Sequence, residues 1–250
     1  MDYGCRDLVA VISGGSSGIG RAVAAKLLAD GAKVYILGRS KERGQEAVAA
    51  LEKEAGARPV FLGCDVRHGE ECKAALAQVT EEQVHILINS AGLYKEERLE
   101  QLTEESYAEL MDVNVKGTML LTQAALPKMY GGGAIINIAS DAGVSGNYGC
   151  PVYCASKGAV VALTRALALD LAPAIRVNCV CPADVDTPLL ARQLEANGGT
   201  YTVADMAEAY PLGRIGRPEE IAHVVCGLVS PVNGFMTGSV VIVDGGLTAK

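Results

Sequence analysis

Short apolar runs recur along the chain, and segments with helical periodicity separate them. Continuous apolar runs of this length are typical of strands that are buried on both faces of a sheet. The segments between them, such as residues 42–56 and 70–78, carry apolar residues on one helical face and charges on the other. The pattern predicts strands over residues 8–12, 33–37, 59–64, 84–88, 134–138, 176–180 and 239–243.

Strands and helices alternate along the whole chain, which predicts an α/β fold. Because crossovers between parallel strands are almost always right-handed, the seven strands are expected to form one doubly wound parallel sheet with helices on both faces. No linker or internal repeat interrupts the alternation, so residues 1–250 are predicted to form a single domain. The polar stretch 189–212 shows no strand pattern and is predicted to be a lid-like insertion over the mouth of the site.

A glycine-rich loop directly follows the first predicted strand, and a helical segment and a second strand come next. This order is the dinucleotide-binding unit of Rossmann-like folds. Glycines let the backbone turn sharply and approach a pyrophosphate, which the N-terminus of the helix then faces. The cofactor-binding residues predicted in this loop are Ser13, Gly14, Ser16, Ser17, Gly18, Ile19 and Gly20.

The end of the second strand bears on the choice between NAD(H) and NADP(H). A carboxylate there would hold the ribose 2′-hydroxyl of NAD(H), whereas an arginine would accommodate the 2′-phosphate of NADP(H). No acid is present at residues 37–39, and Arg39 is placed to meet a phosphate, with Ser40 and Arg43 beside it. We therefore predict a preference for NADP(H), the alternative being that Arg39 is a solvated loop residue.

Composition and charge narrow the class of protein. Half of the residues are hydrophobic, but there are no tryptophans and only two phenylalanines, so the core must be aliphatic. A net charge of −7 argues against a nucleic-acid partner, which needs a basic face, and gives no support to binding an anionic membrane. No apolar run reaches the ~18 residues of a membrane span, and the acidic N-terminus does not resemble a signal peptide. A cytoplasmic location is the expectation.

The cysteines and histidines do not form a metal-binding pattern. Most of the eight cysteines lie in apolar runs, where cysteine behaves as a small hydrophobic residue, and their spacing lacks paired C-x2-C knuckles. We expect free thiols and no metal site. His68, His85 and His223 are scattered and are expected to be structural or exposed.

Tyr153 and Lys157 are the strongest candidates for chemistry. They are four residues apart in a long helical segment and therefore lie on one face. An ammonium beside a phenol favours the phenolate, so we expect Lys157 to lower the pKa of Tyr153 towards neutrality and to make it a general acid or base. The pair alone favours an ordinary Tyr/Lys pair on a helix surface, and the catalytic interpretation prevails only when the nucleotide loop, Asn114 and Ser140 are expected at the same end of the sheet.

Further motif residues accompany the glycine loop and the Tyr153–Lys157 pair. Together the pieces are Gly14-x-x-x-Gly18-x-Gly20, Asp65, Asn89-Ser90-Ala91-Gly92, Asn114, Ser140, Tyr153-x-x-x-Lys157 and Pro182-x-x-x-x-Thr187. In this order and spacing, from about residue 8 to 246, the sequence resembles the short-chain dehydrogenase/reductase family of the compact single-domain type. Three positions depart from the family pattern: Ser13 replaces threonine, Ser90 replaces asparagine and Ala183 replaces glycine.

The resemblance implies a role for each matching residue. Tyr153 would exchange a proton with the reacting oxygen, Lys157 would lower its pKa and hold the nicotinamide ribose, and Ser140 would hydrogen-bond that oxygen. Asn114 would support a water chain to Lys157, although it also fits a buried structural amide. The further cofactor-binding residues implied are Asp65, Val66, Asn89, Ala91, Gly92, Pro182, Val185 and Thr187, besides Tyr153 and Lys157.

The resemblance also implies a reaction class and an assembly. We expect an oxidoreductase that interconverts a secondary alcohol and a ketone with NADP(H), and a homo-oligomer, a tetramer or else a dimer. The small-molecule substrate is left open between a hydroxysteroid or bile acid and a 3-oxoacyl thioester. The residues predicted to border the substrate are Leu93, Asp141, Asn147, Cys150, Ala183 and Leu189.

Other functions remain as alternatives. An NAD(H)-dependent polyol or sugar dehydrogenase would use the same residues. A catalytically silent nucleotide-binding or regulatory protein would normally lack the tyrosine or the lysine, and both are present here. A nucleotide-sugar epimerase of the extended family is disfavoured because such chains carry an additional substrate domain.

Overall fold

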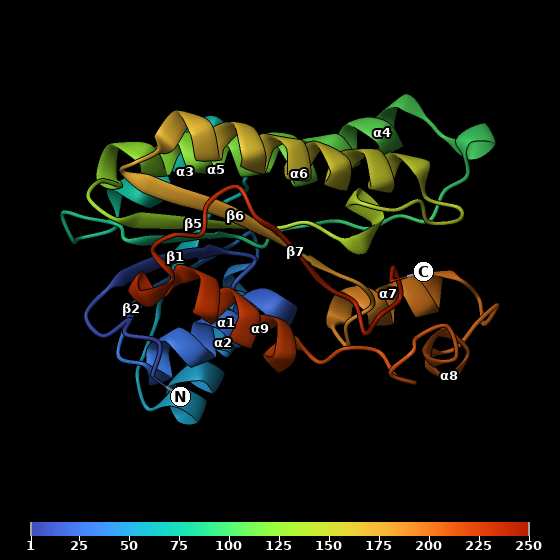
Figure 1. Ribbon diagram of the computed structural model, residues 1–250, viewed down its shortest axis with the longest axis horizontal. Helices are drawn as coiled ribbons and strands as arrows, with labels where there is room; N and C mark the ends of the chain where they lie inside the picture. The colour runs from blue at the N-terminus through green and yellow to red at the C-terminus, as the bar shows by residue number, and fades with distance from the viewer. Residues whose placement is uncertain (1, 250) are drawn as a thin grey trace.

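The computed structural model describes residues 2–249 and contains one parallel sheet of seven strands (Figure 1). The strand order is β3-β2-β1-β4-β5-β6-β7, with all neighbouring pairs parallel. This confirms the predicted doubly wound, Rossmann-like sheet. The strands are β1 Val9–Ser13, β2 Lys33–Gly38, β3 Val60–Gly63, β4 Ile86–Asn89, β5 Gly133–Ile138, β6 Ile175–Pro182 and β7 Val240–Val243.

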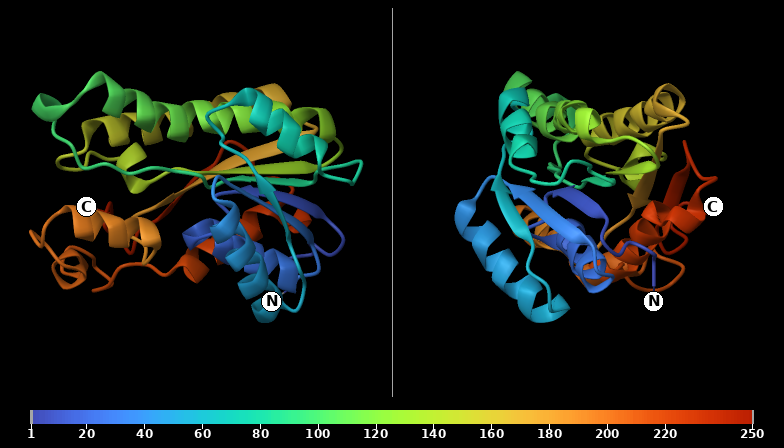
Figure 2. Two further views of the ribbon diagram at one scale, coloured as in Figure 1. Left: turned by 180° about the vertical axis from the view of Figure 1, so that it is seen from behind. Right: turned by 90° about the vertical axis from the view of Figure 1, so that its left-hand side faces the viewer.

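Helices cover both faces of the sheet, as the aliphatic runs require (Figures 1 and 2). One face packs against α1, α2 and α9, and the other against α3, α5 and α6, so each face has its own layer of buried aliphatic side chains. The helices are α1 Gly18–Ala29, α2 Lys41–Ala55, α3 Gly69–Ala77, α4 Glu104–Met111, α5 Gly117–Ala125, α6 Pro151–Leu171, α7 Pro188–Ala196, α8 Val203–Ala207 and α9 Pro218–Val229.

The predicted helix over residues 104–126 is interrupted. A π-helical turn, η2 (Asp112–Lys116), lies between α4 and α5 and contains Asn114. Such single π turns occur frequently at functional sites. At the end of this turn Gly117 lies so close to Val66 that a Cβ would approach its side chain to 2.6 Å. The turn therefore sets the position of Asn114 and the close contact between this helix and the loop after β3.

The polar stretch 189–212 contains no strand, as predicted, but most of it is helical. It includes nearly all of α7 and the whole of α8, each begun by a threonine cap: Thr187 accepts from the backbone N–H of Leu190, and Thr202 forms a capping box with Asp205. Both helices lie beyond the carboxyl end of the sheet (Figure 1). This placement brings residues 189–212 to the carboxyl ends of the strands, where doubly wound sheets bind their ligands.

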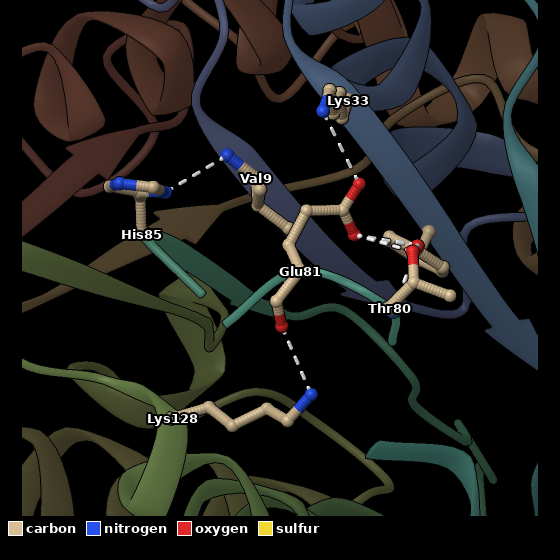
Figure 3. Close-up of polar contacts among 7 residues, drawn as sticks. Val9, Lys33, Thr80, Glu81, His85 and Lys128 are labelled. Atoms are coloured by element: carbon tan, nitrogen blue, oxygen red, sulfur yellow. Dashed lines mark hydrogen bonds and ion pairs between the residues drawn. The ribbon is translucent and has the colours of Figure 1, made fainter. Parts of the chain in front are cut away.

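A polar cluster lies at the amino-terminal ends of β1, β2 and β4, opposite to the end of the sheet where α7 and α8 lie (Figure 3). The imidazole Nδ1 of His85 accepts the backbone N–H of Val9 at 3.1 Å, Lys33 pairs with Glu81, and Lys128 donates to the Glu81 carbonyl oxygen at 3.1 Å. Burial lowers the pKa of His85, which keeps the ring neutral and able to accept. His85 therefore has a structural role, and the side chains at these strand ends bind one another and the backbone.

Helix α6 is the one described helix that is long and apolar enough to cross a bilayer. It packs against β6 and the turn η4 (Asp141–Gly143), and 44% of its most apolar window is buried inside the protein. These are the properties of a core helix. The eight cysteines are free thiols, and residues 2–249 contain no group of three or more side chains that could hold a metal ion.

Candidate active site

A cavity of about 690 Å³ lies beyond the carboxyl ends of β1, β2, β4, β5 and β6. It runs from the glycine loop and Arg39 at one end to Tyr153 and α7 at the other. The strands that meet here are neighbours in the sheet, so residues far apart in the sequence share one edge. This is the position at which doubly wound sheets bind their ligands.

The glycine loop forms a cradle without side chains. Gly14 has a positive φ of 65°, and a Cβ there would approach the Ser90 carbonyl oxygen to 2.9 Å. A Cβ on Gly20 would approach the Gly14 carbonyl oxygen to 2.5 Å, so the helix could not pack so closely on the strand. The predicted residues of the loop that line the cavity are Gly14, Ser16, Ser17, Gly18 and Ile19.

Two residues predicted to contact the cofactor instead hold the loop in place. Gly20 does not line the cavity and serves the close packing just described. The hydroxyl of Ser13 is buried, and it accepts the backbone N–H groups of Ser90 and Ala91, each at 3.1 Å. Ser13 therefore joins the ends of β1 and β4 and does not face the cavity.

The far end of the cavity has the character of a phosphate- and adenine-binding region. Arg39, Ser40, Arg43, Asp65 and Val66 line it, as predicted for all but Arg43, which the sequence indicated as an assisting residue. Ser40 caps α2, so the positive N-terminus of that helix also points to this end. Arg67 donates to the carboxylate of Asp65, and these hydrogen bonds keep the pKa of Asp65 below its usual range. Asp65 is therefore ionised and fixed, while the Arg39 side chain is exposed.

The middle of the cavity is lined by the ends of β4 and β6. Ala91, Gly92, Pro182, Val185 and Thr187 all face it, as predicted. None carries a large side chain, and together with the glycine cradle they leave a channel that fits an extended dinucleotide.

Asn89, which was also expected to contact the cofactor, is buried behind this wall. Its amide donates to Thr122 and to Asn137, and its Oδ1 has no hydrogen-bond partner. It braces β4 against β5 and α5, so the expectation of a direct contact is not met.

Tyr153, Ser140 and Lys157 meet at the near end of the cavity. Tyr153 and Lys157 lie on α6 as expected, and Ser140 lies two residues after the end of β5. The Lys157 ammonium donates to the Ile138 carbonyl oxygen at 2.9 Å and lies 5.8 Å from the centre of the Tyr153 ring. All three side chains are largely buried, yet each reaches the cavity wall. The arrangement offers a proton donor, a second hydroxyl and a cation around one point.

The expected effect of Lys157 on Tyr153 is not what the structure shows. Burial raises the pKa of Tyr153 above its ordinary value, with Asp141 adding to the rise and the Ser140 hydroxyl opposing it. Burial also lowers the pKa of Lys157 to about 8. The prediction of a near-neutral tyrosine was wrong for this state because removal from water disfavours both charged forms, and the sequence does not reveal that burial.

Asn114 lies behind the site and does not line the cavity. Its side chain accepts the Leu93 N–H at 2.8 Å and donates to the Leu93 carbonyl oxygen and to the Ser156 hydroxyl. A Cβ on Gly92 would lie 3.6 Å from the Lys157 ammonium and 3.7 Å from the Asn114 Oδ1, so these groups surround Gly92 together. The contacts fit the structural amide that the sequence left open, and the role in a water chain remains a prediction.

The predicted substrate-bordering residues divide into two groups. Asp141, Asn147, Ala183 and Leu189 line the cavity. Leu93 and Cys150 do not, because both pack into the small apolar cluster around Tyr153. The sequence did not separate the two groups, since positions in loops near the motif gave no sign of which way the side chains point.

Several cavity residues had no signal in the sequence. The Tyr94 ring packs edge-on against Tyr153 with centroids 4.8 Å apart, and the Tyr210 hydroxyl donates to Asp184 at 2.6 Å. The Tyr201 hydroxyl accepts from Gln193 and donates to Glu96, both at 2.8 Å. All of these residues lie on the cavity wall. Only Asp184 could have been found, because it follows a strand end; the tyrosines come from loops without a pattern.

A nucleotide-sized cavity with an acid–base tyrosine, a serine and a lysine at one end defines a nucleotide-dependent oxidoreductase. Comparison with known proteins agrees: the family model described as enoyl-(acyl carrier protein) reductase matches residues 14–248. The chain belongs to the short-chain dehydrogenase/reductase family, whose members use NAD(P)(H).

Individual relatives span the whole chain. An uncharacterized oxidoreductase of Thermotoga maritima is 38% identical over 96% of this chain and 97% of its own. An NAD-dependent glycerol dehydrogenase of Listeria innocua is 36% identical over 100% of this chain and 97% of its own. The crystal structure of a short-chain type dehydrogenase/reductase from Mycobacterium marinum superposes with a TM-score of 0.92 at 33% identity, covering 99% of this chain and 98% of that one.

The burial of Lys157 predicts a trade-off between stability and function. A pKa lowered from 10.5 to about 8 corresponds to a cost of about 3 kcal/mol for holding the charged form below pH 8. We expect Lys157→Met to raise the free energy of unfolding at pH 7 by about 1–3 kcal/mol, less than the full cost because Ile138 loses a donor.

The stability advantage of Lys157→Met over the wild type should shrink as the pH rises from 8 to 10.5. In that window the folded protein releases the Lys157 proton while the unfolded chain keeps it, so the wild type gains stability and the variant does not. Urea unfolding of the wild type and of Lys157→Met at pH 7 and pH 10 measures the difference in their free energies of unfolding at each pH. A variant that is less stable at pH 7 would show that the buried ammonium is a net stabiliser.

Proposed function

We propose that this protein interconverts a secondary alcohol and a ketone with NADP(H) as cofactor. The observation that carries the proposal is the meeting of Tyr153, Ser140 and Lys157 at one end of a cavity whose other end is a glycine cradle with arginines. The bound nicotinamide supplies or accepts the hydride. The chain contributes position, a proton and hydrogen bonds.

Each of the three residues has a distinct task. The raised pKa of Tyr153 keeps its phenol protonated at neutral pH, so it can donate to the oxygen of a ketone as negative charge develops there. The Lys157 ammonium, with a pKa near 8, is still mainly charged at pH 7 and stabilises the phenolate that remains. The Ser140 hydroxyl holds the reacting oxygen against Tyr153. In the oxidation of an alcohol the proton moves in the opposite direction.

Removal of the Tyr153 hydroxyl tests the proton transfer. We expect Tyr153→Phe to lower kcat by about 10²–10⁴-fold on any accepted substrate while NADPH still binds, because the ring and its packing are retained. Tyr107→Phe, on the exposed side of α4, is the matched control and should keep full activity. Wild-type turnover by Tyr153→Phe, measured with an NADP(H)-coupled assay, would refute the mechanism.

The preference for NADP(H) rests on the arginine end of the cavity. Arg39, Arg43 and the N-terminus of α2 form a positive region, and the end of β2 carries no acid that would repel a 2′-phosphate. The relative from Listeria innocua is NAD-dependent, so this end of the site is where the two proteins are expected to differ.

A cofactor titration tests this preference. Arg39→Ala should weaken NADPH binding by about tenfold or more and leave NADH binding nearly unchanged, because only NADPH carries the 2′-phosphate. Fluorescence titration of both cofactors gives the two dissociation constants, and Lys41→Ala, the next cation along the chain, is the control. Tighter binding of NADH by the wild-type protein would overturn the assignment.

Residues 189–212 are proposed to act as a lid over the substrate end. Leu189, Gln193, Tyr201 and Met206 line the cavity, and the Tyr201–Glu96 hydrogen bond joins this stretch to the loop after β4. That bond is exposed and is the point at which the lid would open.

A homotetramer is proposed as the working form. Large apolar side chains are exposed on two surfaces: Met119 and Leu169 on α5 and α6, and Val232 and Phe235 near β7. Apolar surface of this kind marks interfaces in soluble proteins. Light scattering should therefore give about four times the chain mass of 25.9 kDa, and a monomer mass would contradict the proposal.

A further inference from the structure

The Ser140 hydroxyl has a partner other than a substrate. Its proton is donated to the Asp141 carboxylate at 2.8 Å, and its oxygen accepts the Ala142 N–H at 3.2 Å. Asp141 is 4% exposed, lines the cavity, and is absent from the ion pairs of the described chain. Its other oxygen has only a long contact of 3.4 Å with the Asn147 amide.

This arrangement conflicts with the task of Ser140. A serine hydroxyl carries one proton, and an ionised carboxylate only accepts, so in this state Ser140 presents lone pairs to the reacting oxygen. A ketone, and still more the oxygen on which charge develops, needs a donor at that point. The serine donates to the reacting oxygen at the lowest cost when another group replaces its hydrogen bond to Asp141.

We propose that the substrate itself supplies that group: a hydroxyl on the carbon next to the reacting carbon donates to Asp141 and releases the Ser140 proton to the reacting oxygen. Asp141 is then a specificity-determining residue, and the substrates are vicinal diols and the corresponding α-hydroxy ketones. This inference rests on the proposed alcohol–ketone reaction and names its substrate class. Because Ser140 and Asp141 are consecutive and directly bonded, a donor one carbon away from the reacting oxygen is the one that can serve both.

The remaining lining of this end agrees with a hydroxyl-bearing substrate. Asp184 lies on the same cavity, half-buried, with the Tyr210 hydroxyl as its donor, and Asn147 adds an amide. A 3-oxoacyl thioester has a methylene where Asp141 needs a further donor, and an apolar steroid carbon there would leave Asp141 with only the Ser140 hydroxyl and the long Asn147 contact. An ammonium is disfavoured because it would withdraw electrons from the carbon that loses hydride and would face the buried cation Lys157.

Matched substrate pairs test the inference. The wild-type enzyme is assayed with NADP⁺ on 2,3-butanediol against 2-butanol and on 1,2-cyclohexanediol against cyclohexanol, and in reduction on acetoin against 2-butanone. Each pair differs by the one neighbouring oxygen function. We expect kcat/KM to be about ten- to a hundredfold higher for the hydroxyl-bearing member, the range of a hydrogen bond to a charged group. Equal or better use of the simple alcohols overturns the inference and leaves the oxidoreductase function standing.

Two variants show whether Asp141 is the residue responsible. Asp141→Ala should bring the ratio within each pair close to one by lowering kcat/KM for the diols while the simple alcohols stay level or improve, because Ser140 is then free to donate. Ser145→Ala, which removes only a contact to the Asp141 backbone, is the matched control and should keep the diol preference. An equal loss on both members of a pair would indicate a merely structural residue and overturn the assignment.

The remaining outcomes are also decisive. If Asp141→Ala does not fold, Asp141→Asn retains the shape with a weaker, neutral acceptor and should reduce the diol preference in part. An unchanged preference in that variant overturns the role of Asp141. A faster reaction of 3-amino-2-butanol than of the diol overturns the choice of a hydroxyl. No turnover of any pair, with NADPH binding intact, overturns the choice of vicinal diols, whereas the proposed alcohol–ketone reaction is tested separately by Tyr153→Phe.

Discussion

The burial of Lys157 beneath the end of β5 is the contact on which the candidate site depends. Its ammonium is held by the Ile138 carbonyl oxygen, one of the groups that a parallel sheet leaves at its carboxyl edge. The contact requires α6 and η4 to approach closely, and a Cβ on Gly143 would come within 2.7 Å of the Lys157 carbonyl group. Once α6 is fixed there, Tyr153 one turn earlier must reach the same point as Ser140.

A second set of contacts fixes the other side of α6. The π turn around Asn114 directs its amide to the backbone of Leu93 and to Ser156, whose hydroxyl donates to the Tyr153 carbonyl oxygen. Three segments of the chain are thereby joined by buried or partly buried hydrogen bonds, which carry more weight in a low-dielectric interior than in water. The site is rigid where the proton moves, and its outer wall, formed by α7 and α8, is held mainly by exposed contacts such as Tyr201–Glu96.

Charge is distributed unevenly along the cavity. Arginines and the N-terminus of α2 make the nucleotide end positive, whereas Asp141 and Asp184 make the substrate end acidic. Burial and the charge of Asp141 raise the pKa of Asp184, and Asp141 also contributes to the raised pKa of Tyr153. Asp141 and Asp184 thus both favour the protonated form of Tyr153, whose proton the proposed reaction uses. The same two acids line the substrate end, so the choice of substrate and the acid–base chemistry depend on the same residues.

Much of the site was predictable because its motifs are local. The glycine loop, Arg39, Ser140 and the Tyr153–Lys157 pair each follow or lie within a strongly patterned segment, and all line the cavity as expected. Errors arose where a side chain at a strand end could turn either way. Asn89 and Ser13 turn inward to brace the strands, and Leu93 and Cys150 pack into the cluster around Tyr153.

The sequence by itself determined the parallel sheet and the dinucleotide loop, because hydrophobic period and glycine spacing are properties of neighbours along the chain, and its motifs indicated Tyr153 and Lys157 as the candidates for acid–base chemistry. Only the tertiary structure decided the electrostatics. Whether a phenol titrates near or above its ordinary range depends on burial and on acids that arrive from other elements, here Asp141 after β5 and Asp184 after β6. The partner of the Ser140 proton was likewise invisible in the sequence, since a hydrogen bond between adjacent side chains depends on how the backbone turns at the strand end.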